Sequence, residues 1–257
     1  SKVDQEFHQV PGWEARFLYP PFFALAISPL SRMNYVAAYW AWTGFTVILY
    51  SASILLLIRE SHGNALILAL TAVACPAFHW LILAGQTTVI ALFIFVLIYL
   101  AMTRQLYSIT GALIALLAYR PQFMILLVPI CLMKLPWSAF SGFFSMLFAL
   151  FVAGAMGLSL DSYARYFALI QEITDLLRLA IHPLGLFISA YGLLRSLGSE
   201  TLATTGSLVL GIFLGFRLFV RWPSDHNLGR FSSWFASLIL ATLLTMSYSL
   251  IYDLLLI

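Results

Sequence analysis

Charged residues are scarce in this sequence. Only 9% of its 257 residues are charged, whereas 62% are hydrophobic. Soluble domains carry roughly a quarter charged residues, so a water-soluble fold of this size could not cover its surface. A chain surrounded by lipid has no such need, because its outer surface can be apolar. The composition therefore excludes an ordinary soluble domain and predicts an integral membrane protein.

Basic clusters, cysteine pairs and common catalytic signatures are also lacking. The formal net charge is only +3 and no basic stripe is present, which argues against nucleic acid as a partner. Cys75 and Cys131 both lie in apolar stretches, where small buried side chains are expected rather than a disulfide. No His or Cys pair has metal-ligand spacing, so no metal ligands are assigned. Walker, Rossmann and Gly-x-Ser-x-Gly patterns are absent.

Long apolar runs are abundant. A bilayer core about 30 Å thick needs roughly 20 apolar helical residues to cross. The runs do not alternate in polarity, so helices rather than a closed barrel are predicted. We expect one all-α membrane domain over residues 1–257, a polytopic transmembrane helix bundle. The predicted spans are approximately 35–58, 64–83, 87–103, 138–158, 202–220 and 231–257.

Two further regions do not fit simple crossings. Residues 107–134 hold two short apolar runs, split by Tyr119-Arg120-Pro121-Gln122. Each run covers only about 20 Å at about 1.5 Å per residue. An arginine and a proline at such a break predict a broken helix or hairpin that lines a cavity. Residues 182–198, Gly-rich and apolar, are predicted to form a re-entrant or interfacial helix.

The short loops predict an orientation. Basic residues at loops between spans favour the cytoplasmic side; they are Arg59, Arg104, Lys134, Arg217, Arg221 and Arg230. The Gly85-Gln86 loop, the break at Arg120 and the region 159–201 then face outward. Polar residues are costly within a membrane, so a cluster of them at one face is a functional-site hypothesis. The predicted substrate-binding residues at this face are Tyr19, Gln86, Arg120, Gln122, His182, Tyr252 and Asp253.

Arg120 is the strongest candidate among them. Long apolar runs flank it, so its charge needs an anion or a hydrated cavity. A guanidinium presents a planar fork of donors that suits phosphate. The alternative is a structural ion pair with a carboxylate from another helix, such as Asp253, and the sequence slightly favours phosphate.

The other candidates also have alternative interpretations as residues with purely structural roles. Gln86 could hydrogen-bond a sugar hydroxyl, or its segment could simply turn the chain and cap a helix. Tyr19 could cap a lipid or sugar pocket, or Tyr19-Pro20-Pro21 could only begin a membrane helix rigidly. A lone histidine such as His182 is more often structural than catalytic. Asp253 could pair with Arg120, bind substrate or lie at the interface.

The order of the motifs resembles glycosyltransferase family 87, the polyprenyl-phosphate-mannose-dependent mannosyltransferases. The resemblance rests on Tyr19-Pro20-Pro21, Pro29-Leu30, Gly85-Gln86, Leu-Ala-Tyr-Arg-Pro-Gln ending at Gln122, and Tyr252-Asp253. It implies a multi-spanning architecture of GT-C type in a bacterial plasma membrane, with the active face outward.

The resemblance also implies an activity. The enzyme would move a sugar, expected to be mannose, from a polyprenyl-phosphate donor to an acceptor hydroxyl of a glycolipid or glycan. A carboxylate in the first outer loop would act as general base. A cation such as Arg120 would stabilise the leaving phosphate. No bound cofactor is expected, and the need for a metal ion stays open.

The chain departs from the family in three places. The catalytic aspartate is expected upstream of Ser1, with the first spanning helix, and the apolar run at residues 254–257 suggests truncation there too. Asp4 is the alternative base, which leaves open whether the chain is active as it stands. Met246-Ser247-Tyr248 stands where the family often has Ser-Pro-Tyr, and Arg120 stands where lysine is common.

Two other functions compete with a transferase. A transporter or flippase also suits broken helices and an embedded arginine, although such proteins often carry internal repeats and none is found here. A non-catalytic scaffold is favoured only if the upstream loop lacks an acidic residue.

Overall fold

The computed structural model describes residues 19–60, 65–179, 189–196, 200–223 and 228–245, and every regular element within them is a helix. This confirms the predicted all-α membrane protein. The helices are α2 (Pro21–Ile27), η1 (Ser28–Arg32), α3 (Tyr35–Glu60), α4 (Ala65–Ala74), α5 (Pro76–Ala84), α6 (Thr88–Thr103), α7 (Tyr107–Leu116), η2 (Leu117–Tyr119), η3 (Pro121–Phe123), α8 (Met124–Lys134), α9 (Trp137–Gly157), α10 (Leu160–Leu179), α11 (Ala190–Ser196), α12 (Glu200–Val220) and α13 (Leu228–Thr245).

Three helices of the described residues are long and apolar enough to cross a bilayer. They are α3, α9 and the Thr201–Val220 part of α12, and they match the predicted spans at 35–58, 138–158 and 202–220. Helix α6 matches the predicted span at 87–103 in position but has only 16 residues. At about 1.5 Å per residue it is about 24 Å long, shorter than a bilayer core.

The predicted span at 64–83 is wrong as a continuous helix. It breaks at Cys75 into α4 and α5, because Pro76 cannot donate the next helical hydrogen bond and disfavours helical backbone before it. The carbonyl of Ala72 would normally accept from residue 76. Instead the Tyr50 hydroxyl donates to this carbonyl at 2.8 Å, and the Tyr50 ring stacks on Phe78 with centroids 3.9 Å apart. The Cys75 N–H also donates to the Ala72 carbonyl, at 3.3 Å, so the neighbouring helix adds a second and shorter hydrogen bond to the group whose usual donor the proline removes.

The predicted break within residues 107–134 is confirmed. Helices α7 and α8 are separate, and the two 3₁₀ turns η2 and η3 meet between them at Arg120. Pro129 lies inside α8, although the sequence analysis placed no break there.

The region 159–201 was predicted as an outer loop and is largely helical where described. Helix α10 has 20 residues and carries charges such as Arg165 and Glu172, so it lacks the apolar length that marks a span. It packs instead against α9 and α2. Of the predicted re-entrant helix at 182–198, only the short α11 lies within the described residues. Helix α13 covers 228–245, and the rest of the predicted span to residue 257 lies outside them.

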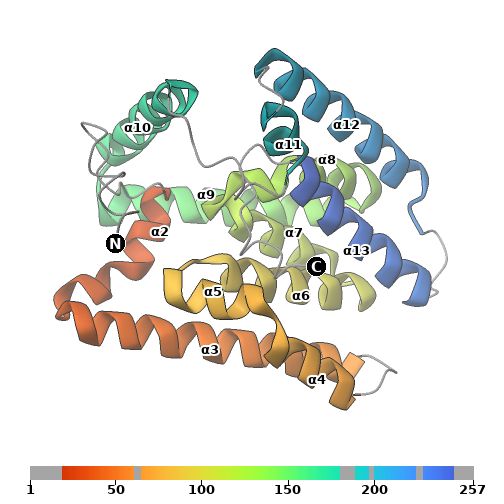
Figure 1. Cartoon of the computed structure of the whole chain (residues 1–257), viewed down its shortest axis with the longest axis horizontal. Helices are drawn as coiled ribbons and strands as arrows, with labels where there is room; N and C mark the ends of the chain where they lie inside the picture. The colour runs from red at the N-terminus through yellow and green to blue at the C-terminus, as the bar shows by residue number, and fades with distance from the viewer. Residues whose placement is uncertain (1–18, 61–64, 180–188, 197–199, 224–227, 246–257) are drawn as a thin grey trace.

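Helix α6 lies in the middle of the molecule. Figure 1 shows α3 along one side with α4 and α5 folded back against it, and α12 and α13 on the other side. Most residues of α6 are buried. Helices α7 and α9 approach closely, since a Cβ at Gly111 would collide with the Ala139 carbonyl and one at Gly142 with the Ser108 carbonyl. Such small-residue contacts are typical of membrane helix pairs.

The basic loops gather at one end of the bundle. Glu60 and Arg104 form an ion pair at 2.6 Å that joins the ends of α3 and α6. The Tyr99 hydroxyl lies 2.8 Å from the Ser232 hydroxyl, so the start of α13 meets the end of α6. The Lys134 ammonium lies 3.9 Å from the centroid of the Phe219 ring near the end of α12. This arrangement agrees with the predicted grouping of these loops, and their cytoplasmic placement stays a prediction.

Candidate functional site

The turn before α6 forms the centre of the candidate site. Gly85 adopts φ +63°, a left-handed conformation that glycine tolerates without steric cost. The Trp42 indole N–H donates to the Gly85 carbonyl at 3.1 Å and ties the turn to α3. Thr87 occupies the cap position of α6, but its side chain makes no capping hydrogen bond. The capping interpretation of this segment is therefore wrong for Thr87, whose hydroxyl is engaged elsewhere.

The break between α7 and α8 supplies a buried arginine to this turn. Arg120 is only 7% exposed. Its Nη1 donates to the Thr88 hydroxyl at 3.2 Å and its Nη2 donates to the Gln86 Oε1 at 3.3 Å. The guanidinium carbon also lies 5.8 Å from the centroid of the Phe123 ring, within the range of a cation–π contact.

The start of α2 closes the site from a third direction. The Tyr19 and Thr87 hydroxyls lie 3.0 Å apart, and the Tyr119 hydroxyl donates to the Thr87 carbonyl at 3.0 Å. The Phe23 ring stacks on Tyr119 with centroids 5.0 Å apart, and it packs at a tilt against Tyr19 with centroids 4.9 Å apart. Pro21 is the first residue of α2, so the proline pair does begin a helix rigidly. The same segment also positions Tyr19.

The structure thus brings together Tyr19, Gln86 and Arg120, which are separated by up to 101 residues (120 − 19) in the sequence. Gln122 is half-buried in η3, and no described contact joins it to the other three. The remaining predicted site residues lie outside the described residues; they are Asp4, His182, Tyr252 and Asp253. The ion pair between Arg120 and Asp253 therefore stays a hypothesis.

Thr88 is a site residue that the sequence analysis missed. Its side chain is fully buried and accepts a hydrogen bond from Arg120. A second threonine after the Gly-Gln turn was the available signal, and threonine at a helix start is common enough to hide it.

Neutral side chains help to hold the buried charge of the cluster. A buried charge is costly unless it is hydrogen-bonded, and the hydroxyl of Thr88 and the amide oxygen of Gln86 meet that need without adding negative charge. Both acceptors also fix the direction of the guanidinium fork. Among the described residues, no group of three His, Cys, Asp or Glu side chains is placed to hold a metal ion.

An apolar groove adjoins the cluster on the next face of α2. Its volume is about 370 Å³, and it lies between α2, α9 and α10. Burial raises the pKa of the Tyr163 hydroxyl, which donates to the Phe151 carbonyl at 3.2 Å and so presents its ring to the groove. The lining residues are Phe22, Phe144, Leu147, Phe148, Leu150, Phe151 and Tyr163.

Comparison with known proteins gives one result. The family model for glycosyltransferase family 87 matches residues 17–247, which include every described residue of the site, whereas Tyr252-Asp253 lies beyond the match. No curated protein and no solved structure matches the chain. The match covers most of the sequence, and the apolar helices place the protein in a membrane. The chain is a membrane glycosyltransferase and belongs to glycosyltransferase family 87.

Proposed function

We propose that this transferase takes a sugar, mannose, from a polyprenyl-phosphate donor and passes it to a hydroxyl of a glycolipid or glycan acceptor at the outer face of the membrane. The observation that carries the proposal is the Arg120 guanidinium, held by Gln86 and Thr88 at the end of the bundle opposite the basic loops.

Arg120 is proposed to bind the donor phosphate. During transfer the bond between the anomeric carbon and the phosphate oxygen breaks, and the phosphate leaves with the bonding electrons. A guanidinium that is already oriented stabilises this developing charge without reorganising. Charge-assisted hydrogen bonds between a guanidinium and phosphate oxygens would add to this stabilisation.

Gln86 and Tyr19 are proposed to position the sugar. The Oε1 of Gln86 accepts from Arg120, so its amide nitrogen is the group that we expect to donate to a sugar hydroxyl. Half-buried Tyr19 packs at a tilt against Phe23, and this aromatic wall suits the apolar face of a sugar ring. Gln122, His182, Tyr252 and Asp253 remain proposed substrate ligands on the strength of the sequence alone.

The groove between α2, α9 and α10 supports a lipid-borne donor. A polyprenyl chain is apolar and needs an apolar path that starts close to the phosphate site. Phe22 lines this groove, while the adjacent Phe23 packs in the cluster around Arg120. The groove and the cluster therefore lie on two faces of α2, separated by the width of that helix. A soluble nucleotide sugar would have no use for such a groove.

The general base is proposed to be an acidic residue of the first outer loop, upstream of Tyr19. The family resemblance leads us to expect a carboxylate in this loop, and Asp4 is the candidate within this sequence. It would take the proton from the acceptor hydroxyl as that oxygen attacks the anomeric carbon.

The test is a transfer assay with full-length protein in membranes, radiolabelled polyprenyl-phosphate-mannose and a lipid acceptor. We expect Arg120→Ala to raise the donor KM and lower kcat at an unchanged protein level, with partial recovery in Arg120→Lys. Arg32→Ala is the matched control, since Arg32 is an exposed arginine close to α2.

Two results would contradict the proposal. Equal loss of protein level and activity in Arg120→Ala would indicate a structural ion pair. Movement of the substrate across the membrane without a new glycosidic bond would indicate a transporter or flippase.

A further inference from the structure

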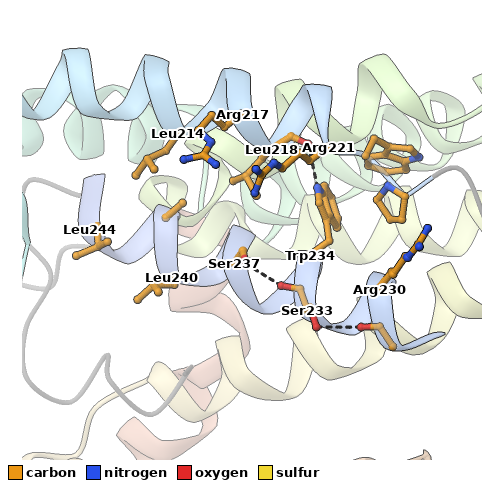
Figure 2. Close-up of a pocket in the computed structure, with 14 residues that line it drawn as sticks. Leu214, Arg217, Leu218, Arg221, Arg230, Ser233, Trp234, Ser237, Leu240 and Leu244 are labelled. Carbon is orange, nitrogen blue, oxygen red and sulfur yellow. Dashed lines mark hydrogen bonds between the residues drawn. The ribbon is translucent and has the colours of Figure 1, made fainter. Parts of the chain in front are cut away.

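A second cavity lies between α12 and α13, at the end of the bundle opposite the candidate active site. Its volume is about 960 Å³. Figure 2 shows Arg217 and Arg221 extending from α12 toward α13, and Arg230 rising from the start of α13 on the other side. None of these residues takes part in the proposed transfer.

The charged side chains among the described residues that line this cavity are all arginines. Arg217 and Arg221 lie one helical turn apart, a spacing at which like charges destabilise each other. Arg230 lies in the first turn of α13, where the helix dipole adds further positive potential. All three are exposed, and no carboxylate is found among the described residues that line the cavity. A bound anion would relieve this repulsion.

The opposite end of the cavity is apolar. Leu214, Leu240 and Leu244 line it on the side away from Arg230 (Figure 2). Leu240 is 40% exposed, so an apolar ligand has surface to cover. The cavity therefore changes from basic to apolar along its length, as a phospholipid changes from headgroup to acyl chain.

The middle of the cavity is a rigid aromatic wall. The Trp234 indole N–H donates to the Leu218 carbonyl at 2.9 Å, which satisfies a carbonyl near the end of α12. Trp222 meets the Trp234 ring edge-on, with centroids 4.7 Å apart. Tryptophan is enriched at the level of lipid headgroups, so these two rings indicate the depth at which the cavity lies.

Small side chains keep the cavity open on α13. The Ser233 and Ser237 hydroxyls donate to the carbonyls of Gly229 and Ser233, at 3.0 and 2.7 Å. Because both hydroxyls are engaged with their own helix, they add little polarity to the space above them.

We propose that this cavity binds an anionic phospholipid, with its phosphate between Arg217, Arg221 and Arg230 and one acyl chain along Leu214, Leu240 and Leu244. The lipid would come from the leaflet on the side of the basic loops, where basic pockets between membrane helices bind anionic headgroups. The volume is that of a pocket for a large ligand. Free phosphate would occupy only a small part of it and leave the apolar end uncovered.

The test measures lipid binding to purified full-length protein in detergent by native mass spectrometry. The probes are dioleoyl-phosphatidylglycerol, dioleoyl-phosphatidylcholine and inorganic phosphate. We expect phosphatidylglycerol to bind best at one saturable site. Arg217→Gln should weaken its binding about tenfold, because a charge-assisted hydrogen bond is lost.

Arg59→Gln is the matched control. Arg59 is also exposed, lies in the last turn of a long helix and belongs to the basic end, but it does not line the cavity. The affinity of the Arg59→Gln variant for phosphatidylglycerol should stay within about twofold of that of the unmodified protein. Arg217→Lys keeps the positive charge at this position but loses the planar fork of donors. We therefore expect a loss of phosphatidylglycerol affinity between those of Arg59→Gln and Arg217→Gln.

A steric variant keeps the proposal testable if the arginine variants fold poorly. Ser237→Trp projects a large ring into the middle of the cavity while it leaves all three arginines in place, and it should abolish binding of phosphatidylglycerol. Unchanged binding in this variant would overturn the proposal. So would equal binding of the two lipids, equal losses in Arg217→Gln and Arg59→Gln, or a site saturated by inorganic phosphate as readily as by lipid.

Discussion

At the residue scale, the position of Arg120 depends on two neutral side chains. Gln86 and Thr88 accept from different nitrogens of the guanidinium, so they hold its plane in one orientation. Phe123 covers it from within the same break. A side chain that reached solvent would keep its charge without help, but this one is 7% exposed and needs these acceptors.

Thr88→Val tests this positioning role. The substitution keeps the shape of the side chain and removes the acceptor for Nη1 of Arg120. We expect kcat/KM for the donor to fall about tenfold, because the charged guanidinium loses one of the hydrogen bonds that orient it. Kinetics with the polyprenyl-phosphate donor measure this.

Thr103→Val is the control for that substitution. The Thr103 hydroxyl donates only to the Leu100 carbonyl of its own helix, at the far end of α6. Similar losses of kcat/KM in both variants would argue against a specific role for Thr88.

At the element scale, breaks in helices are satisfied by neighbouring helices. Pro76 removes a donor from α5, and Tyr50 of α3 supplies a hydroxyl to the carbonyl that remains. The Cys75 N–H also donates to this carbonyl, at 3.3 Å, so the Tyr50 hydroxyl supplies the shorter of its two hydrogen bonds at the break.

Tyr50→Phe is expected to lower the free energy of unfolding by about 1 kcal/mol, because the Ala72 carbonyl loses the shorter of its two hydrogen bonds. Thermal unfolding in detergent measures the effect. In a Pro76→Ala background the backbone N–H is restored, so the same substitution should cost less. Equal cost in both backgrounds would show that the hydroxyl acts by another route.

Gly142→Ala should destabilise the contact between α7 and α9. An added Cβ would meet the Ser108 backbone, which cannot move aside as a flexible side chain could. We expect the thermal midpoint in detergent to fall. Gly44→Ala is the control, because nothing lies within 4 Å of a Cβ there. That variant should be neutral or slightly stabilising, since alanine favours helix over glycine.

At the scale of the whole molecule, the bundle has two chemically different ends. One carries the ion pair between Glu60 and Arg104 and the cavity with three arginines. The other carries the cluster around Arg120 and the apolar groove. We expect the first end to face the cytoplasm, because basic loops are retained there.

Cysteine labelling on intact cells tests this orientation. In a variant with Cys75 and Cys131 replaced by serine, we expect a membrane-impermeant maleimide to label Ser31→Cys but not Arg59→Cys. Both positions are exposed, and they lie at opposite ends of the bundle. The reverse pattern would place the candidate active site in the cytoplasm and rule out an outward-facing transferase.

Much of this protein could be predicted from its sequence, because hydropathy and chain breaking act locally. The long apolar runs predicted α3, α9 and α12, and the polar interruption at Arg120 predicted the broken helix. The order of short motifs indicated the family that the family model identifies. Local patterns failed where a single proline broke an apolar run at Pro76, and where the charged α10 formed a helix through packing.

Only the tertiary structure decided which of the polar residues meet. A sequence records how each residue tolerates lipid, but it does not record which helices pack together. The Tyr19 hydroxyl meets Thr87 because α2 packs against the centre of the bundle, and Arg120 meets Gln86 because the break folds back onto the turn before α6. The same holds at the other end, where the arginines of α12 and α13 line one cavity because Trp234 joins the two helices.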